Sequence, residues 1–327
     1  MKYLTSLALL LPLAMAGQQF YGNEPLAHTY SIVAIDESTG EMGVAVQSHW
    51  FSVGTLVIWG EAGVGVVATQ SFVNPALGPK GLELMKLGLA PSEVLSKLLA
   101  ADPGREVRQV AMLNAKGEVA AHTGNQCIEA AGHQMGEGYS VQANLMDNDR
   151  VWPEMAMAFE SSQGQPLAER LVAALEAAQA AGGDIRGKQS AAILVVAPES
   201  SGKSWVDRRV DLRIEDHPEP VKELRRLLTV HRAYEHMNRG DLAVEKGDVT
   251  LAMEEYGAAE ELFPDNLEMK YWHAISLANI GKIEESLLLF AEVFRGDSNW
   301  KKLTPRLIKN QLLTVDEATL ERILKVE

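Results

Sequence analysis

Short apolar runs separated by turn residues fill the chain from Thr29 to about residue 214. TYSIVAI and MGVAVQS flank the turn DESTGE, which predicts a β-hairpin that begins at Thr29. VRQVAML and EVAAHT flank NAKG and predict a second hairpin. Further strands are expected at TLVIW, GVGVVATQ, GYSVQANL, SAAILVVA and SWVDRRVDLRIED.

Helical patterns alternate with these strands. They are GPKGLELMKLG, a segment opened by Pro91, VWPEMAMAFES and PLAERLVAALEAAQAAGG. Pro91 suits a first helical turn, and Gly182-Gly183 suits the end of a helix. Strand pairs, then helix pairs, then strands again predict a layered α+β domain over residues 29–228, with two sheets between helices.

Residues 229–327 follow a different, helical pattern with a period of 34 residues. Small, aromatic and proline positions of one unit recur in the next, as Gly240/Ala274, Ala252/Ser286, Tyr256/Phe290, Ala259/Val293 and Pro264/Ser298. The period predicts two tetratricopeptide-like repeats, and an unrelated pair of helical hairpins is the alternative. Capping helices are expected over LTPRLIKNQLL and after a capping box formed by Thr314 and Glu317.

The N-terminal segment has the features of an export signal. Residues 1–16 carry an early lysine, an apolar run and a small-x-small triplet, and the run is too short for a permanent membrane anchor. A buried N-terminal helix is the alternative. Residues 17–28 are polar and read as a spacer, so the sequence predicts a secreted or periplasmic protein.

Composition excludes several classes of function. The net charge of −14 and the absence of a Lys/Arg cluster argue against nucleic acid or an anionic membrane surface as partner. Cys127 is the one cysteine, which excludes an internal disulfide framework. His122, Cys127 and His133 lack a fourth ligand at a usual zinc spacing, so neither a metal nor another cofactor is expected.

Thr29 is the residue on which a catalytic interpretation depends. Within a chain, a threonine hydroxyl is a poor nucleophile and needs an adjacent base. At an N-terminus its own α-amino group, with a pKa of about 7.7–8.0, can supply that base. The hairpin also brings Ser48 and His49 back towards Thr29. By residue type alone, a β-branched residue at a strand start is the plainer interpretation.

Several long blocks carry a resemblance to a known family. TYSIVAIDESTGEMGVAVQSHWFSVG, AGVGVVATQSFVNPALGPKGLELM and the segment from ADPGREV to VQANLM are among them. They resemble the bacterial family called domain of unknown function 1028, across nearly all of residues 29–228. The resemblance implies a four-layer αββα sandwich of the N-terminal-nucleophile hydrolase type, with a threonine at the position of Thr29. In this sequence twelve residues separate Thr29 from the signal cleavage site, so its release needs a further cut after His28.

Candidate site residues lie at the ends of the predicted strands. The catalytic candidates are Thr29, Ser48, His49, His122 and Asn144. His49 is either a proton shuttle or an exposed strand-end residue. Amide side chains at strand ends either stabilise an oxyanion or bond to loop backbone, and Asn144, Gln142 and Gln70 are of this kind.

The loop GGDIRGKQSAA adds charged candidates for substrate binding. Asp184, Arg186, Lys188 and Gln189 lie there between a helix end and a buried strand. Arg186 and Lys188 suit an anionic group on a substrate, because arginine is the usual bidentate partner of a carboxylate. The alternative is a solvated loop.

The sequence thus predicts an exported amide hydrolase or peptidase-like enzyme that acts on a small amide or peptide-like substrate. The alternative is a non-catalytic binding or scaffold protein whose helical repeats hold a peptide or protein partner. Two repeats form only a small groove, so packing on the first domain or homo-oligomer formation is a further interpretation of that region.

Overall fold

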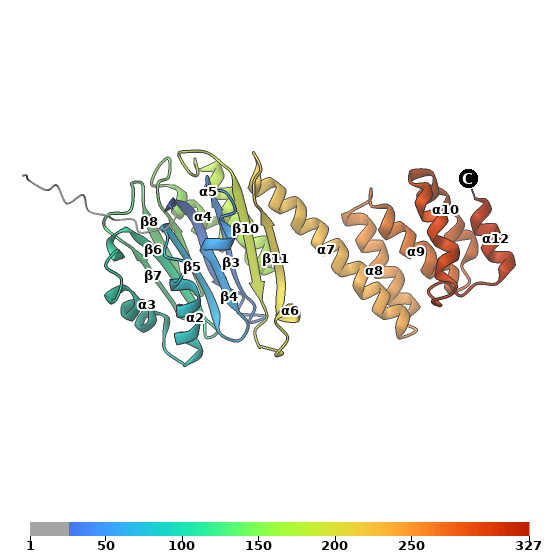
Figure 1. The fold of residues 1–327 in the computed structure, drawn as a ribbon, viewed down its shortest axis with the longest axis horizontal. Coiled ribbons are helices and arrows are strands. Elements are labelled where there is room, and N and C mark those ends of the chain that lie inside the picture. Colours follow the sequence, from blue (N-terminus) through green and yellow to red (C-terminus); the bar gives the residue numbers. More distant parts are fainter. Residues whose placement is uncertain (1–25, 327) are drawn as a thin grey trace, which may run out of the picture.

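The computed structural model describes residues 26–326, and residues 26–214 hold two antiparallel sheets (Figure 1). Sheet A has the order β1-β5-β6-β7, with β4 beside β5, and sheet B has the order β11-β10-β3-β2-β9-β8. Sheet A comprises β1 (Leu26–Ala27), β4 (Ile58–Glu61), β5 (Gly65–Phe72), β6 (Arg108–Asn114) and β7 (Val119–Thr123). Sheet B comprises β2 (Thr29–Ile35), β3 (Met42–Ser48), β8 (Gly132–Gly136), β9 (Tyr139–Ala143), β10 (Ser190–Val196) and β11 (Arg208–Ile214).

Helices cover the outer faces of both sheets, and the inner faces pack against each other (Figure 1). Helices α2 (Leu77–Lys86) and α3 (Pro91–Ala100) lie on sheet A, and α4 (Val151–Ser161) and α5 (Leu167–Ala180) lie on sheet B. Val33, Val46 and Val66 belong to the apolar cluster between the sheets. Each such side chain contributes about 1.5–3 kcal/mol on full burial. The predicted α+β class is confirmed.

Local sequence explains the central hairpin. The β2 and β3 strands pair from Thr29 opposite Ser48 to Ile35 opposite Met42, and the turn contains Gly40 at a φ of 73°. Gly43 lets α5 approach the sheet closely, since a Cβ there would lie 2.5 Å from a methyl carbon of Leu171. The hairpin therefore has the register that its sequence predicts.

Two predicted strands begin instead with a helical turn. The first half of TLVIW forms α1 (Gly54–Val57) and only its end forms β4. Ser52 has a φ of 54°, and Val57 donates to the Val53 carbonyl, so a local turn overrides the β propensity of these residues. SWVD likewise forms α6 (Ser204–Asp207) before β11.

The C-terminal region is helical, as predicted (Figure 1). A phenyl ring carbon of Tyr256 lies 2.6 Å from where a Cβ on Gly240 would be, which explains the small residue at that position of the period. Tyr256 and Phe290, equivalent in the period, are both buried. The helices are α7 (Pro220–Glu245), α8 (Val249–Leu262), α9 (Leu267–Asn279), α10 (Ile283–Gly296), α11 (Ser298–Leu303) and α12 (Glu317–Lys325).

Two expectations near the C-terminus are wrong. LTPRLIKNQLL contains only the end of α11 and a short 3₁₀ helix, Thr304–Leu307. Thr314 does not cap α12, because its backbone N–H and its hydroxyl both bond to the Asn279 side chain. Asp316 caps that helix by accepting from the Thr319 N–H at 2.8 Å.

Helix α7 joins the two regions and contributes to both cores. Leu224 and Leu228 pack in the core on the helical side of sheet B, whereas Ala233 and Met237 pack among the C-terminal helices. The Arg225–Glu176 ion pair, at 2.8 Å, also joins α7 to α5. The predicted boundary near residue 228 thus lies inside one continuous helix.

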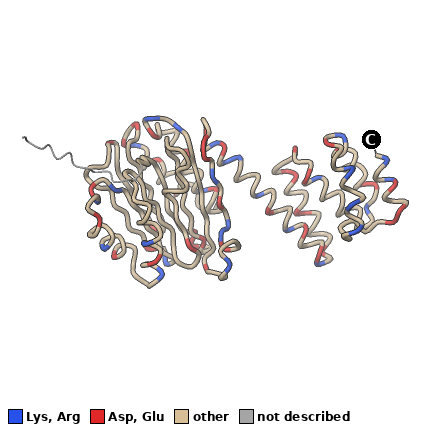
Figure 2. Tube along the Cα trace, in the orientation of Figure 1, with Lys and Arg blue, Asp and Glu red and all other residues tan. Residues whose placement is uncertain are grey.

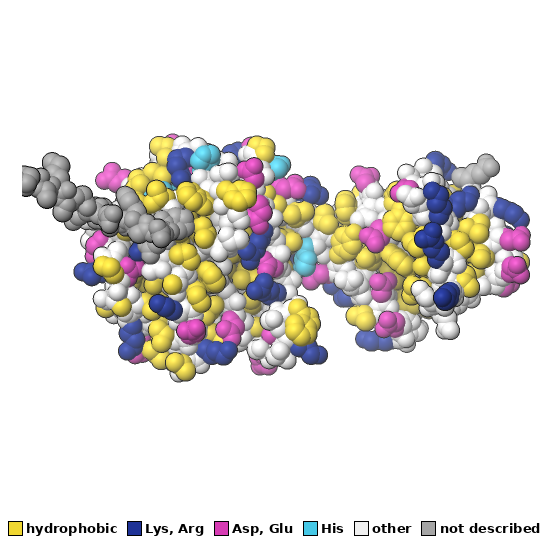
Figure 3. Space-filling view, in the orientation of Figure 1, with side chains coloured by type: hydrophobic (Ala, Val, Ile, Leu, Met, Phe, Trp, Pro, Cys, Tyr) yellow, Lys and Arg dark blue, Asp and Glu magenta, His cyan; other side chains and the backbone are white. Residues whose placement is uncertain are grey.

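The surface is of mixed charge in both regions. Lys and Arg are distributed over the whole trace among the acidic residues (Figure 2). Apolar side chains are interspersed with charged ones on the face drawn in Figure 3.

Candidate functional site

Thr29 begins β2 in the interior of sheet B, between β3 and β9. It is 0% exposed, and it shares a face of the strand with Ser31, whose hydroxyl donates to the Gln70 side chain on sheet A. Thr29 therefore faces the space between the sheets. Its Oγ1 donates to the Ala27 carbonyl oxygen at 2.8 Å.

The peptide bond that precedes Thr29 is held by two donors. The carbonyl oxygen of His28 accepts from Ser48 Oγ at 2.5 Å and from Arg186 Nη2 at 2.8 Å. Asp184 is buried and holds the guanidinium in place, with Arg186 Nη2 at 2.7 Å and Nε at 3.0 Å from its two oxygens. A hydroxyl and a guanidinium thus converge on one carbonyl oxygen, which is the arrangement that stabilises negative charge there.

His28 is part of this site, although the sequence suggested a spacer. It is 4% exposed, its Nδ1 lies 2.9 Å from Asn144 Oδ1, and its ring meets Phe72 edge-on at 5.2 Å between centroids. Burial lowers the pKa of the imidazole, the Asn144 hydrogen bond opposes that shift, and the charge of Arg186 adds to it. Residues 17–25 of the predicted spacer and the predicted signal peptide lie outside the described residues.

Buried amides surround the carbonyl oxygen of Thr29. It accepts from Gln70 Nε2 at 3.1 Å and from Asn144 Nδ2 at 3.3 Å. Gln109 links these two amides, since its Oε1 accepts from Gln70 Nε2 at 2.7 Å and from Asn144 Nδ2 at 2.9 Å. Gln142 extends the network, with its Nε2 donating to Ser31 Oγ.

Two residues of this site, Gln109 and His28, were not among the predicted candidates. Gln109 lies in VRQVAML, where a polar residue inside an apolar run was the available signal. Burial of an amide without a hydrogen bond costs free energy, so a glutamine in such a run indicates a polar network.

Three predicted site residues lie away from Thr29. His49 is exposed, and its backbone N–H donates to Asp184. Gln189 donates to the Asp216 side chain in an exposed hydrogen bond, away from Thr29. His122 pairs with Val110, a member of the apolar cluster under α2 and α3, and so lies on the outer face of sheet A. Their predicted roles stay predictions.

The remaining charged and thiol groups are also placed. Lys188 donates to Glu219 at 2.6 Å, at the start of α7 rather than at Thr29. Cys127 is buried, and its thiol donates to the Arg108 carbonyl. His133 Nδ1 lies 2.8 Å from Thr123 Oγ1. Within residues 26–326, no group of three or more His, Cys, Asp or Glu side chains is arranged to hold a metal ion.

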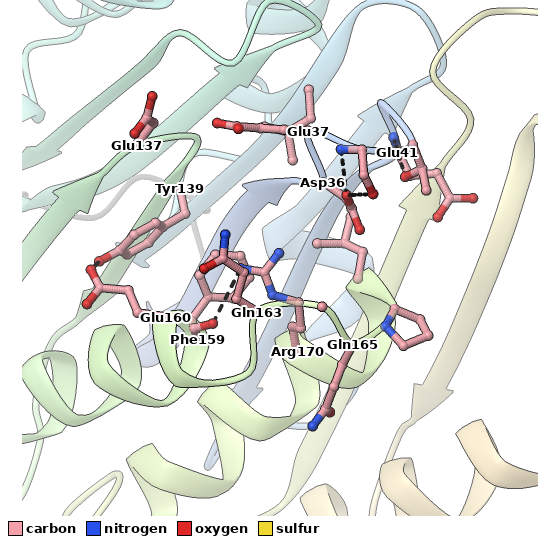
Figure 4. A pocket seen from close by; sticks show the side chains of 16 residues that line it. Asp36, Glu37, Glu41, Glu137, Tyr139, Phe159, Glu160, Gln163, Gln165 and Arg170 are labelled. Atoms are coloured by element: carbon pink, nitrogen blue, oxygen red, sulfur yellow. Dashed lines mark hydrogen bonds between the residues drawn. The ribbon is translucent and has the colours of Figure 1, made fainter.

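An open pocket of about 780 Å³ lies at the opposite end of β2 (Figure 4). Its lining includes Ile35, which is six strand residues or about 20 Å from Thr29. None of the predicted site residues lines it. Its charged side chains are Asp36, Glu37, Glu41, Glu137, Glu160 and Arg170. Arg170 lies over the Phe159 ring, with Cζ 3.9 Å from the centroid.

No helix in the described part of the chain is long and apolar enough to span a membrane. A model of the family described as "Family of unknown function (DUF1028)" matches residues 29–224, more than half of the sequence. The chain belongs to this family. The family match begins at Thr29, the residue at which β2 begins.

A solved structure of the same family is similar. The crystal structure of protein SPO2555 from Silicibacter pomeroyi has 30% sequence identity to this DUF1028 protein and a TM-score of 0.56. The similarity covers 62% of this chain and 85% of that one. No curated protein matches this chain.

Proposed function

We propose that this DUF1028 protein is an amide hydrolase of the N-terminal-nucleophile type, with Thr29 as nucleophile once the bond between His28 and Thr29 is cut. The observation that carries the proposal is the His28 carbonyl oxygen, on which Ser48 Oγ and Arg186 Nη2 converge. The position of Thr29 at the start of an inner strand, between two sheets covered by helices, supports it.

The chain would release its own nucleophile. Thr29 Oγ attacks the carbonyl carbon of His28, and the oxygen of that carbonyl takes the negative charge under its two donors. The bond between that carbon and the Thr29 nitrogen then breaks, and the nitrogen keeps the electron pair and receives the hydroxyl proton. An ester between His28 and Thr29 Oγ remains, which water hydrolyses to a free acid and a free N-terminal threonine.

The same groups would then turn over a small amide or peptide-like substrate. The freed α-amine, with an ordinary pKa of about 7.7–8.0, accepts the proton of Thr29 Oγ as the hydroxyl attacks the substrate carbonyl. Ser48 and Arg186 stabilise the oxyanion, because they already face such an oxygen. Gln70 and Asn144 fix the Thr29 backbone through its carbonyl.

The predicted leader adds the compartment to this proposal: residues 1–16 would direct export to the periplasm or the medium. The helical region would be a tetratricopeptide-like module that binds a peptide or protein, or that associates with a second copy of the chain.

A non-catalytic binding protein is the second candidate, and one observation favours it. In the intact chain Thr29 is 0% exposed and its hydroxyl donates to the Ala27 carbonyl oxygen, so without the cut no substrate amide reaches that hydroxyl. In that case the helical region alone would carry the function.

The two candidates differ in the N-terminus of the purified protein. Intact-mass measurement of wild type should show a chain that begins at Thr29, whereas Thr29→Ala should stay joined at residue 28. Thr29→Ser keeps a hydroxyl and is expected to cleave, which separates the chemistry from any effect on folding. A folded wild-type protein that remains joined between His28 and Thr29 would contradict the hydrolase proposal and favour the binding protein.

A further inference from the structure

We infer that residues 26–28 occupy the acyl-side substrate sites of this enzyme. The substrate class would then be an extended peptide-like amide with a flat, hydrogen-bonding ring at the position of His28 and an alanine-sized side chain before it. This inference rests on the proposed function and deepens it.

The chemistry of self-cleavage provides the first argument. The ester that joins His28 to Thr29 Oγ is an acyl-enzyme, and it differs from the ester of a turnover cycle only in what the acyl group is. The site that holds residues 26–28 beside Thr29 is therefore the site that holds the acyl part of a substrate. Residues 26–28 are in this sense the first substrate.

The backbone of Leu26 and Ala27 is bound as an added strand. Leu26 pairs with Phe72 and Ala27 with Ser71, antiparallel to the end of β5. Ser71 has a φ of 73°, an uncommon conformation for a residue other than glycine, at the point where β5 receives this strand. Main-chain pairing of this kind binds extended peptides irrespective of most side chains.

Side-chain selection is expected at the position of His28. The imidazole is 4% exposed, with Asn144 Oδ1 at 2.9 Å and the Phe72 ring against it. A buried side-chain oxygen faces the ring nitrogen, so a residue without a donor leaves that oxygen unpaired. Carboxylate side chains are excluded more strongly, because they place negative charge against the Asn144 oxygen.

The two preceding positions differ in how much they select. Ala27 is 0% exposed and belongs to the apolar cluster between the sheets, whereas Leu26 is 37% exposed. A branched side chain in place of Ala27 would overpack that cluster. A change at the position of Leu26 would alter substrate binding little.

Fluorogenic tripeptide amides test this selectivity on the processed protein. The chain from Thr29 onward retains every strand of both sheets except β1, and the family match begins at the same residue. We expect the kcat/KM of acetyl-Leu-Ala-His-aminomethylcoumarin to exceed that of the Asp analogue at least about tenfold. Valine in place of alanine should lower kcat/KM at least about fivefold, whereas serine in place of leucine should change it less than about twofold.

A binding measurement separates failure of this inference from failure of the proposed function. By calorimetry the free acid acetyl-Leu-Ala-His should bind the processed protein at least about tenfold more tightly than its Asp analogue. Hydrolysis of all the amides at similar rates would overturn the inference and leave the proposed function intact. Preferred binding of the His acid with no hydrolysis of any amide would support the inference and overturn the hydrolase.

A variant at Asn144 assigns the preference to its side chain. Asn144→Leu is expected to reduce the ratio of kcat/KM for acetyl-Leu-Ala-His-aminomethylcoumarin to kcat/KM for the analogue with leucine in place of histidine, because the partner of the imidazole is lost. An unchanged ratio in this folded variant would overturn the assignment. If the variant does not fold, the substrate series on the wild-type protein still decides the inference.

Discussion

The two ends of strand β2 differ in the kind and the burial of their polar side chains. At Thr29 buried amide side chains are joined to one another, the Arg186–Asp184 ion pair holds the preceding carbonyl, and Leu26 and Ala27 pair with β5 beside them. At Ile35 the polar groups are mostly carboxylates around an open pocket. The comparison shows that the open pocket and the hydrogen-bonded peptide bond before Thr29 lie at opposite ends of the same strand.

The largest expected effect is a difference in self-cleavage rate between two arginine variants, one at each end of β2. Arg186→Ala removes one of the two donors to the His28 carbonyl oxygen, so self-cleavage should slow about 10²–10³-fold. Arg170→Ala, in the pocket, should leave the rate unchanged. Timed intact-mass analysis after synthesis in a cell-free system gives both rates. Equal slowing by the two variants would mean that the ends are not independent.

A pair of buried glutamines gives the next largest effect, measured in the uncleaved Thr29→Ala background. Gln109→Met should lower the free energy of unfolding by about 2–4 kcal/mol, because it strips the shared acceptor from Gln70 and Asn144. Gln47 is 0% exposed too, but neither of its amide atoms has a hydrogen-bond partner among residues 26–326.

Gln47→Met is therefore expected to raise the free energy of unfolding by about 1 kcal/mol. Urea denaturation of both variants measures the difference. Destabilisation of similar size by both would show that burial of the amide, rather than its membership of the network at Thr29, sets the effect.

Acidification should change the free energy of unfolding in opposite directions through groups at the two ends of β2, and this is the smallest expected effect. Burial lowers the pKa of His28, so the folded state binds fewer protons than the unfolded one, and stability is lost as the pH falls below about 6.5. Burial raises the pKa of Glu41 in the pocket, so its protonation on acidification favours the folded state.

Two variants in the same uncleaved background isolate these contributions. His28→Phe should reduce the stability lost between pH 7.5 and 5.5, values chosen to lie about one unit on either side of the ordinary histidine pKa. Glu41→Gln should increase that loss, since it removes a compensating group. Identical pH profiles for wild type and both variants would contradict the assignment.

Much of the fold follows from local signals in the sequence. The DESTGE and NAKG turns, Pro91 and Gly182-Gly183 each act within a few residues, so the hairpins and helices around them could be predicted. Predictions failed where a local competitor existed. The Asn279 side chain accepts the hydrogen bonds of Thr314, so Thr314 does not cap α12. A helical turn after Ser52 forms where the start of a strand was predicted.

The site residues likewise fall into a pair that local sequence predicts and a group that it does not. Thr29 and Ser48 could be paired from the sequence, because one short turn fixes the register between them. The other side chains of the site come from distant segments of the chain and from both sheets, namely Arg186, Asn144 and Gln109. No spacing along the chain encodes an approach between two sheets.

The sequence by itself determined the α+β class, the hairpin that begins at Thr29 and the helical C-terminal region, because periodicity and turn chemistry are local. Only the tertiary structure decided that His28 is buried, that Leu26 and Ala27 form a strand on sheet A, and that two donors hold the carbonyl before Thr29. Those features depend on packing between sheets, where burial makes each polar group require a partner.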